Sequence, residues 1–134
     1  MATILLADDD ALVRATIRFI LVGKGHDVIE AANGEEAINV VRSLWPGRTI
    51  VLVITDIIMP KVDGLSLIAE LRKIDGRLKI LAVTGGSRAI HSNFLNAAKN
   101  VGANDALKKP FTHHELLAKV DALLGSFPPA TLAS

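Results

Sequence analysis

The sequence predicts an α/β fold, a doubly wound parallel sheet in which five strands alternate with five helices in three layers. Short runs of branched apolar residues, typical of strands buried on both faces, alternate along the 134 residues with segments whose apolar residues recur at helical spacing. This alternation favours parallel strands joined by right-handed crossovers, with helices on both faces of the sheet. Half of the residues are hydrophobic, and the length suits one domain with a sizeable core.

The first strand is predicted over Thr3–Ala7, and it ends at three consecutive aspartates, Asp8 to Asp10. Asp10 is well placed as the N-cap of the next helix, because its side chain can accept hydrogen bonds from the first turn. Two glycines, Gly23 and Gly25, are expected to end that helix. Its inward-facing residues are expected to be Leu12, Val13, Ile17, Ile20 and Leu21.

A second, edge-like strand is predicted over Asp27–Ala32, and the turn at Asn33-Gly34 leads into a capped helix that ends at Pro46-Gly47. The apolar face of this helix carries Ala37, Ile38, Val41, Leu44 and Trp45. The third strand, Ile50–Ile54, is a continuous run of branched apolar residues. It delivers a single carboxylate, Asp56, at its carboxyl end, where function resides in open α/β sheets.

Beyond Asp56, Met59-Pro60 cannot continue a central strand, since proline lacks the N–H that a sheet requires, and Asp63-Gly64 is a turn dipeptide. A third helix follows with Leu65, Ile68, Leu71 and Ile74 on one face. The fourth strand is predicted over Lys79–Val83 and ends in Thr84-Gly85-Gly86. The fourth helix is expected from about Ser87 to its C-cap at Gly102, with Ile90, Phe94, Ala97, Ala98 and Val101 facing inward.

The last strand, Asp105–Lys108, ends at Lys109-Pro110-Phe111. Thr112 and Glu115 are spaced as a capping box at the start of the last helix. That helix carries Leu116, Leu117, Val120, Leu123 and Leu124 on its apolar side. Residues 1–125 are therefore predicted to form one domain, and residues 126–134 a flexible C-terminal tail.

Composition argues against several classes of protein. The formal net charge of +1 gives no electrostatic footprint for nucleic acid or for an anionic membrane. The lack of cysteine excludes a disulfide framework and a thiolate metal site, and it fits a reducing cytoplasm. No apolar run approaches the roughly 20 residues of a membrane span. The chain reaches its first charges too early for a secretory signal. We therefore expect a cytoplasmic protein without nucleic-acid or membrane contacts.

Four of the five predicted strands end in polar side chains. Asp8 and Asp9 follow the first strand, Asp56 the third, Thr84 the fourth and Lys109 the fifth. The carboxyl ends of parallel strands meet at one edge of the sheet, so we expect the three carboxylates to converge if the first and third strands are neighbours. Converging carboxylates repel one another and call for a cation. Oxygen ligands with room for water suit Mg²⁺, or Mn²⁺ as a substitute.

Each of these residues also has a simpler interpretation. Asp56 could be a polar residue that only closes a strand, and the three aspartates at 8–10 could form a solvated turn. Thr84 before two glycines is common turn chemistry, and Lys109 could be an ordinary surface lysine. The placement of all of them at the ends of successive strands favours a shared site.

Taken together, the segments ILLADDD, TDIIMPKVDG, LAVTGG and LKKPF resemble the receiver domain of the response regulators of two-component signalling. The resemblance covers about residues 3–125, in the order and at the spacing of that family. It implies a flavodoxin-like fold with the strand order 2-1-3-4-5. It also implies a phosphoacceptor that controls a signal, rather than an enzyme acting on other substrates. Such a protein catalyses only its own phosphorylation and dephosphorylation.

The resemblance assigns a role to each residue of the predicted site. Asp56 would be the nucleophile that accepts the phosphoryl group, and Thr84 and Lys109 would bind the phosphoryl oxygens. Asp9 and Asp56 would ligate Mg²⁺, Asp8 would act mainly through a bound water, and Ile58 would offer its backbone carbonyl. No organic cofactor is implied. A metal and a lysine are needed because like charges oppose the attack of a carboxylate on a phosphoryl group. The family usually carries a cis bond between the lysine and Pro110.

The sequence departs from the family pattern at three positions. Many receivers have an aromatic residue three positions before the lysine, where this chain has Ala106, so activation must be read out differently or more weakly. Gly86 has no side chain to position or block an attacking water, and Ile58 is apolar. We therefore expect self-dephosphorylation without special assistance from these two positions.

The resemblance implies a stand-alone receiver that takes its phosphoryl group from a histidine kinase or a histidine phosphotransfer protein. Its output partner would bind about Ser87–Leu124, the surface of the fourth helix, the fifth strand and the fifth helix. Two alternatives stay open. One is a phosphorylation-independent interaction module, which Ala106 favours and the intact acidic residues oppose. The other is a Mg²⁺-dependent aspartyl-phosphate phosphohydrolase, against which stands Ile58, at the position where a second acid would be needed.

Overall fold

The computed structural model describes residues 2–44, 50–59, 61–85 and 96–125. The elements, in chain order, are β1 (Thr3–Ala7), α1 (Ala11–Gly23), β2 (Asp27–Ala31), α2 (Gly34–Leu44), β3 (Leu52–Asp56), α3 (Gly64–Ile74), β4 (Lys79–Thr84), β5 (Asp105–Lys108) and α5 (His113–Leu124). Residues 96–101 are also helical. The predictions that concern Trp45, Pro46-Gly47, Pro60, residues 86–95 and the tail 126–134 lie outside the described residues.

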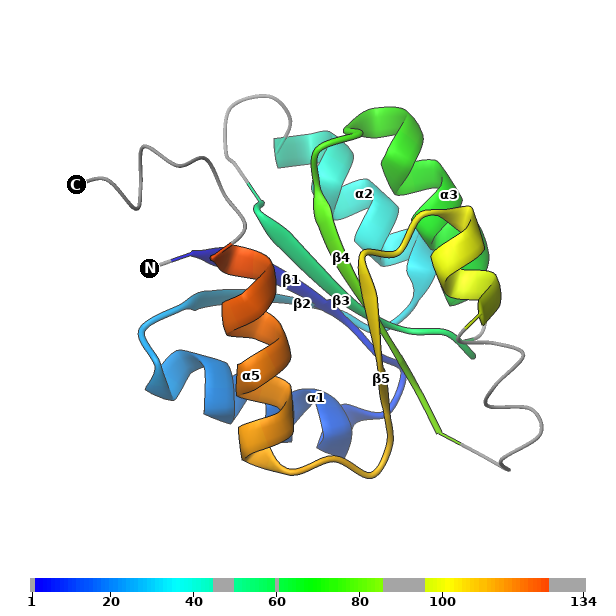
Figure 1. The fold of residues 1–134 in the computed structure, drawn as a ribbon. Helices are drawn as coiled ribbons and strands as arrows, with labels where there is room; N and C mark the ends of the chain where they lie inside the picture. The colour runs from blue at the N-terminus through cyan, green and yellow to red at the C-terminus, as the bar shows by residue number, and fades with distance from the viewer. Residues whose placement is uncertain (1, 45–49, 60, 86–95, 126–134) are drawn as a thin grey trace.

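The five strands form one parallel sheet in the order β2-β1-β3-β4-β5, which confirms the predicted topology (Figure 1). β1 and β3 are central neighbours, and Ala7 at the end of β1 pairs with Thr55 in β3. β3 begins and ends two residues later than predicted, so that Asp56 is its last residue rather than a residue beyond it. The reason is its neighbour β4, where Val83 pairs with Asp56 and accepts a hydrogen bond from the Ile57 N–H.

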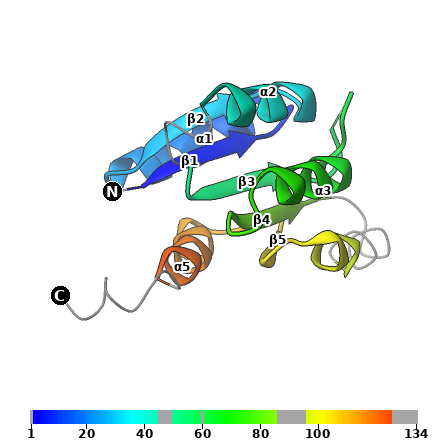
Figure 2. The same cartoon turned by 90° about the horizontal axis from the view of Figure 1, so that it is seen from above.

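Successive strand residues point to opposite faces of the sheet, and each face has its own core. One core joins the strands to α1 and α5, and contains Ile4, Leu6, Ile17, Ile20, Leu21, Leu52, Ile54, Leu81, Val83, Leu107, Leu116, Val120 and Leu123. The other lies under α2, α3 and the helical segment 96–101, and includes Leu5, Ala7, Ala37, Ile38, Val41, Val53, Leu67, Ile68, Leu71, Ile80, Ala82 and Ala98. Figures 1 and 2 show the resulting three layers.

Two predicted helix starts and the predicted end at Gly102 are confirmed by specific hydrogen bonds. The Asp10 side chain accepts from the N–H groups of Leu12 and Val13, and Thr112 and Glu115 form a complete capping box. At the end of segment 96–101, Gly102 has a φ of 126°. Its N–H donates to the Lys99 carbonyl, and the next N–H donates to the carbonyl of residue 98. These two bonds make a Schellman motif, which needs glycine at this position.

Two residues that we expected to face inward do not. Leu12 is 75% exposed, because it lies in the first turn of α1 on the side that points away from the sheet. Val101, at the end of segment 96–101, is 38% exposed. Conversely, Leu67 in α3 is fully buried although it was not among the predicted core residues. Of the helices in the described part of the chain, none is both long enough and apolar enough to cross a membrane.

Candidate functional site

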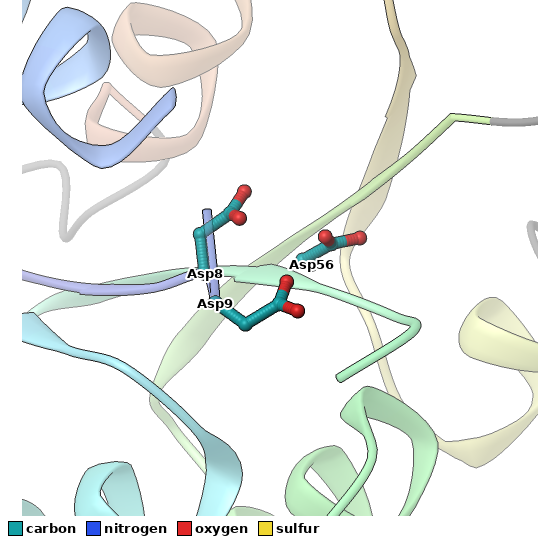
Figure 3. A group of neighbouring side chains, drawn as sticks. All are labelled: Asp8, Asp9 and Asp56. Carbon is teal, nitrogen blue, oxygen red and sulfur yellow. The ribbon is translucent and has the colours of Figure 1, made fainter. Parts of the chain in front are cut away.

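Asp8, Asp9 and Asp56 converge at the carboxyl edge of the sheet (Figure 3). One oxygen from each carboxylate lies within 4.8 Å of the others. The register explains this, because Asp8 and Asp56 directly follow the paired residues Ala7 and Thr55 of β1 and β3. Asp8 is 1% and Asp56 9% exposed, whereas Asp9 is exposed to solvent. The predicted convergence of the three carboxylates is therefore present in the structure.

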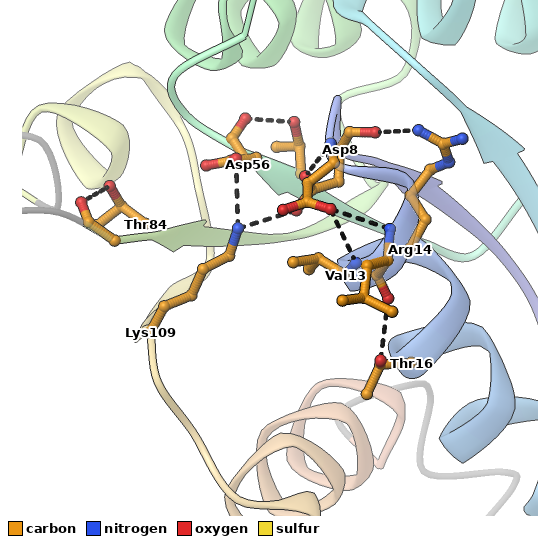
Figure 4. Close-up of polar contacts among 11 residues, drawn as sticks. Asp8, Val13, Arg14, Thr16, Asp56, Thr84 and Lys109 are labelled. Atoms are coloured by element: carbon orange, nitrogen blue, oxygen red, sulfur yellow. Dashed lines mark hydrogen bonds and ion pairs between the residues drawn. The ribbon is translucent and has the colours of Figure 1, made fainter.

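Lys109 reaches into this cluster from the segment after β5 (Figure 4). Its Nζ donates to Asp8 Oδ2 at 3.0 Å and to Asp56 Oδ2 at 3.3 Å. Its backbone N–H donates to the Thr84 carbonyl at 2.7 Å, which fixes the start of the loop to the end of β4. The following bond to Pro110 is cis, as the resemblance implied. Lys109 is thus a partly buried cation shared by two carboxylates, not a solvated surface lysine.

Burial and charge act in opposite directions on these groups. Burial tends to lower the pKa of Lys109, but the hydrogen bonds and charges of Asp8 and Asp56 outweigh it, so that the pKa is raised. For Asp56, burial raises the pKa above that of an ordinary aspartate; Lys109 opposes this effect and Asp8 adds to it. The Lys109 ammonium therefore stays charged. Ionisation of Asp56 costs free energy unless a further positive charge lies beside it.

The main chain of Asp56 is held from two directions. The buried hydroxyl of Thr55 donates to the Asp56 carbonyl at 2.8 Å. The first residue of α3, Gly64, packs against the same peptide, and its N–H donates to the Ile57 carbonyl at 2.6 Å. A Cβ at position 64 would lie 2.3 Å from the Asp56 carbonyl oxygen, which no side chain can tolerate. Glycine at this turn is therefore required by the close approach of α3 to the end of β3.

Thr84 and Ile58 are placed differently from the carboxylates. Thr84 is fully buried at the end of β4, but its hydroxyl donates to the Gly85 carbonyl at 3.2 Å and is turned away from Lys109 and Asp56 (Figure 4). Ile58 follows β3 and is 53% exposed. The structure thus brings Asp8, Asp9, Asp56 and Lys109 together. The roles foreseen for the Thr84 hydroxyl and the Ile58 carbonyl stay predictions.

Arg14 is a residue of this region that the sequence did not reveal. It lies in α1, and its Nη1 donates to the backbone carbonyl of Asp8 at 2.7 Å. An arginine on the polar side of a helix gives no local signal of such a contact. Only the spacing of six residues from Asp8, less than two helical turns, could have indicated that the two lie near each other.

The donor set of the cluster fits a hard divalent cation. It contains only carboxylate oxygens, one group is exposed to solvent, and water could complete an octahedral shell. A cation among them would relieve the repulsion between the three carboxylates. The arrangement as a whole places three carboxylates and a fixed ammonium at one open edge of the sheet, a combination suited to binding a divalent cation and an anionic group.

Comparisons with known proteins agree with this arrangement. A family model described as "Response regulator receiver domain" matches residues 4–121. "Response regulator MprA" of Mycolicibacterium vanbaalenii is 36% identical over 126 residues, which are 94% of this chain and 52% of that protein. "Probable transcriptional regulator ycf27" of Pyropia yezoensis is 36% identical over 121 residues, 90% of this chain and 46% of that protein. The chain therefore spans about half the length of the curated relatives it matches.

Solved structures of similar domains superpose over almost the whole chain. A response regulator receiver domain protein from Clostridium thermocellum has a TM-score of 0.82 at 27% identity, with 93% of this chain and 95% of that chain covered. The receiver domain of NtrX from Brucella abortus has a TM-score of 0.83 at 26% identity, with 92% and 98% covered.

Proposed function

The chain belongs to the response regulator receiver domain family, and from this premise we propose that it is a phosphoacceptor switch of a two-component phosphorelay. Asp56 would accept a phosphoryl group from the phosphohistidine of a histidine kinase or a histidine phosphotransfer protein. The observation that carries the proposal is the cluster itself: three carboxylates within 4.8 Å of one another, two of which are bound by one lysine. This arrangement supplies both the nucleophile and the positive charge that its reaction requires.

In the proposed transfer, a carboxylate oxygen of Asp56 forms a bond to phosphorus as the phosphorus–nitrogen bond to the donor imidazole breaks. The leaving nitrogen keeps the electron pair, and the donor histidine departs as neutral imidazole because the other nitrogen of its ring carries a proton in the reacting phosphohistidine. The Lys109 ammonium pairs with phosphoryl oxygens in place of its present carboxylate partners, and the Thr84 hydroxyl would add a donor if its side chain changed rotamer and left the Gly85 carbonyl. Positioning and charge neutralisation of this kind provide most of the catalysis in phosphoryl transfer.

Mg²⁺, when bound, would supply the charge neutralisation that lets an anionic carboxylate and an anionic phosphoryl group approach. Asp9 and Asp56 would hold it directly, Asp8 through water, and Ile58 through its backbone carbonyl. The fit of the donor set supports this proposal, as does the raised pKa of Asp56, because burial makes its charged form dependent on a nearby cation. Mn²⁺ could substitute, since it prefers the same oxygen ligands.

We propose that the signal leaves through a protein–protein contact of the surface formed by segment 96–101, β5 and α5. The described part of this surface is tied together by Asp105 at the start of β5. Its carboxylate pairs with Lys119 of α5 at 2.9 Å and with Lys99 of segment 96–101 at 4.0 Å. Because one carboxylate joins all three elements, a shift of one of them on phosphorylation would be transmitted to the other two.

One observation favours a second candidate, an interaction module that works without phosphorylation. Ala106, in the middle of β5, is partly buried against the core that includes α2 and α3. The methyl group of an alanine cannot swing between an exposed and a buried position, so this strand offers no side-chain switch of the usual aromatic kind. If phosphorylation at Asp56 leaves every partner affinity unchanged, this second candidate is correct.

Intact-mass measurement tests the first candidate. The protein is incubated with acetyl phosphate and Mg²⁺, beside an Asp56→Asn variant and a sample with EDTA. We expect one added phosphoryl group in the wild type with Mg²⁺ only. No addition in the wild type would refute the proposal, and equal addition to the Asp56→Asn variant would refute the assignment of Asp56. A phosphoryl half-life of minutes or longer is also expected, and one of only seconds would contradict the absence of assistance from Ile58 and Gly86.

A further inference from the structure

Arg14 connects the acidic site, where it meets the main chain of Asp8 (Figure 4), to Glu30 in the second strand of the sheet. Its Nη1 donates to the Asp8 carbonyl at 2.7 Å, and its Nε donates to Glu30 Oε1 in β2 at 3.1 Å. The Arg14 side chain is only 18% exposed. Two bonds from one planar guanidinium fix its position far better than one bond would. Arg14 is therefore held in one place relative to both β2 and the end of β1.

Glu30 is in turn held by a second arginine. Its Oε2 accepts from Arg18, one turn further along α1, at 3.0 Å. Both oxygens of Glu30 are thus occupied, each by a different guanidinium. The carboxylate also neutralises charge close to Arg14, so the guanidinium adds little repulsion toward a cation bound beyond Asp8. Its effect on the acidic site should come from geometry rather than from its charge.

Asp8 is the point at which β1 ends and the acidic turn begins, and each of its polar groups has a partner. Its N–H donates to the Ala31 carbonyl in β2 at 3.1 Å. Its Oδ1 accepts from the Asp10 N–H at 2.9 Å, and its Oδ2 accepts from Lys109. Arg14 supplies the bond to the remaining group, the carbonyl. This carbonyl belongs to the peptide bond that joins Asp8 to Asp9.

We propose that Arg14 is a positioning residue of the cation site. By holding the Asp8–Asp9 peptide against β2 through Glu30, it sets the direction in which the Asp8 and Asp9 side chains leave the main chain toward Asp56. This inference rests on the proposed function insofar as that function requires a divalent cation. Lys109 cannot do the same work, because its ammonium must turn from the carboxylates to the incoming anionic group, whereas the contacts of Arg14 within the described part of the chain are with main chain and Glu30.

Calorimetric titration with Mg²⁺ tests the inference on the wild type, Arg14→Ala, Arg14→Lys and Glu30→Gln. We expect the dissociation constant to rise about tenfold in Arg14→Ala, the usual loss when a residue supporting a metal ligand is removed. Arg14→Lys should recover part of the loss, since an ammonium can reach one acceptor but not bind two in fixed directions. Glu30→Gln should weaken binding while leaving the arginine in place. Arg42→Ala is the matched control, because Arg42 is an exposed arginine in the last turn of α2, 3.6 Å from Glu70.

A second measurement, on the protein without metal, keeps the inference separate from the proposed function. Amide hydrogen exchange in Asp9 and Asp10 should accelerate in Arg14→Ala but not in Arg42→Ala, whether or not the wild type binds Mg²⁺. Failure of the wild type to bind Mg²⁺ would overturn the proposed function alone. Either of two results would overturn the positioning role of Arg14. One is amide exchange at Asp9 and Asp10 that is the same in Arg14→Ala as in the wild type. The other is a wild type that binds Mg²⁺ together with unchanged Mg²⁺ affinity in both Arg14→Ala and Glu30→Gln.

Discussion

Replacing Lys109 with methionine would leave two buried carboxylates without their cation. The Lys109 Nζ lies 3.0 Å from Asp8 and 3.3 Å from Asp56, and those two side chains are 2% and 11% exposed. Methionine keeps a long flexible apolar side chain, so the change removes charge with little loss of packing. At an effective dielectric constant of about 20, each of the two ion pairs corresponds to roughly 5 kcal/mol of gross attraction. Removing one partner of a buried pair costs about 3–5 kcal/mol net, which is the loss of unfolding free energy expected here.

The pH dependence of this loss has a definite sign. The pKa of Lys109 is raised, since the hydrogen bonds and charges of Asp8 and Asp56 outweigh the opposing effect of burial. The stability that Lys109 contributes is therefore present below the lysine pKa of the unfolded chain, about 10.4, and is lost as the pH rises through the higher folded value. In the variant, protonation of Asp56, whose pKa burial already raises, relieves the cost of its unpaired charge. The difference from the wild type should therefore shrink as the pH falls from 7 toward about 4.

Urea unfolding of the wild type and Lys109→Met, in EDTA and in Mg²⁺, at pH 7 and pH 5, measures these effects. We expect the largest difference at pH 7 in EDTA and a partial recovery of the variant in Mg²⁺, because the cation takes over the neutralisation of the carboxylates. Lys119→Met is the control; its pair with Asp105 is at 2.9 Å but more exposed, so a loss of less than about 1 kcal/mol is expected. Equal stability of wild type and Lys109→Met at pH 7 in EDTA would refute the reasoning.

Three further predictions concern the site and the fold around it. Gly64→Ala should lower the unfolding free energy by about 3 kcal/mol, because its Cβ would meet backbone at 2.3 Å. Gly23→Ala is the control: a Cβ there would meet nothing within 4 Å, so the same urea titrations should show a gain of about 0.5 kcal/mol. Asp56→Asn should be more stable than the wild type at pH 7 in EDTA, because burial raises the pKa of Asp56, and this advantage should vanish below about pH 4 in a pH series of thermal unfolding curves. Arg72 binds the Gly102 carbonyl at 2.7 and 2.9 Å. Arg72→Ala should therefore lower the unfolding free energy by about 3 kcal/mol and speed amide exchange around Gly102. Exchange there at the wild-type rate would contradict this role.

The order of elements was predictable because it depends on local pattern, and the convergence of the carboxylates followed once the resemblance placed the first and third strands side by side. A run such as Ile50–Ile54 can be recognised from its own residues, and once strands are parallel, their carboxyl ends must share an edge. The caps at Asp10 and Thr112 were predicted for the same reason, since a cap joins residues two or three positions apart. The exact end of β3 was not, because it depends on pairing with Val83 in another strand.

Contacts made by long polar side chains could not be predicted. Arg14 and Arg72 look like ordinary polar helix residues, yet Arg14 binds the Asp8 carbonyl and Arg72 binds the carbonyls of Gly102 and Leu78. The sequence separation of Arg72 from Gly102 is 30 residues, and no local pattern encodes such a partner. The direction of the Thr84 hydroxyl was equally hidden, because a threonine at a strand end can bind its own chain or a neighbouring site with similar ease.

The most direct test of the central claim is to locate the phosphoryl group on the chain. Protein phosphorylated with acetyl phosphate and Mg²⁺ is reduced with borohydride, which converts an aspartyl phosphate to homoserine, and the peptides are sequenced by mass spectrometry. We predict homoserine at position 56 and nowhere else, and none when Mg²⁺ is withheld. Homoserine at Asp8 or Asp9, or phosphate found only on a histidine or hydroxyl side chain, would contradict the assignment of Asp56 as the phosphoacceptor.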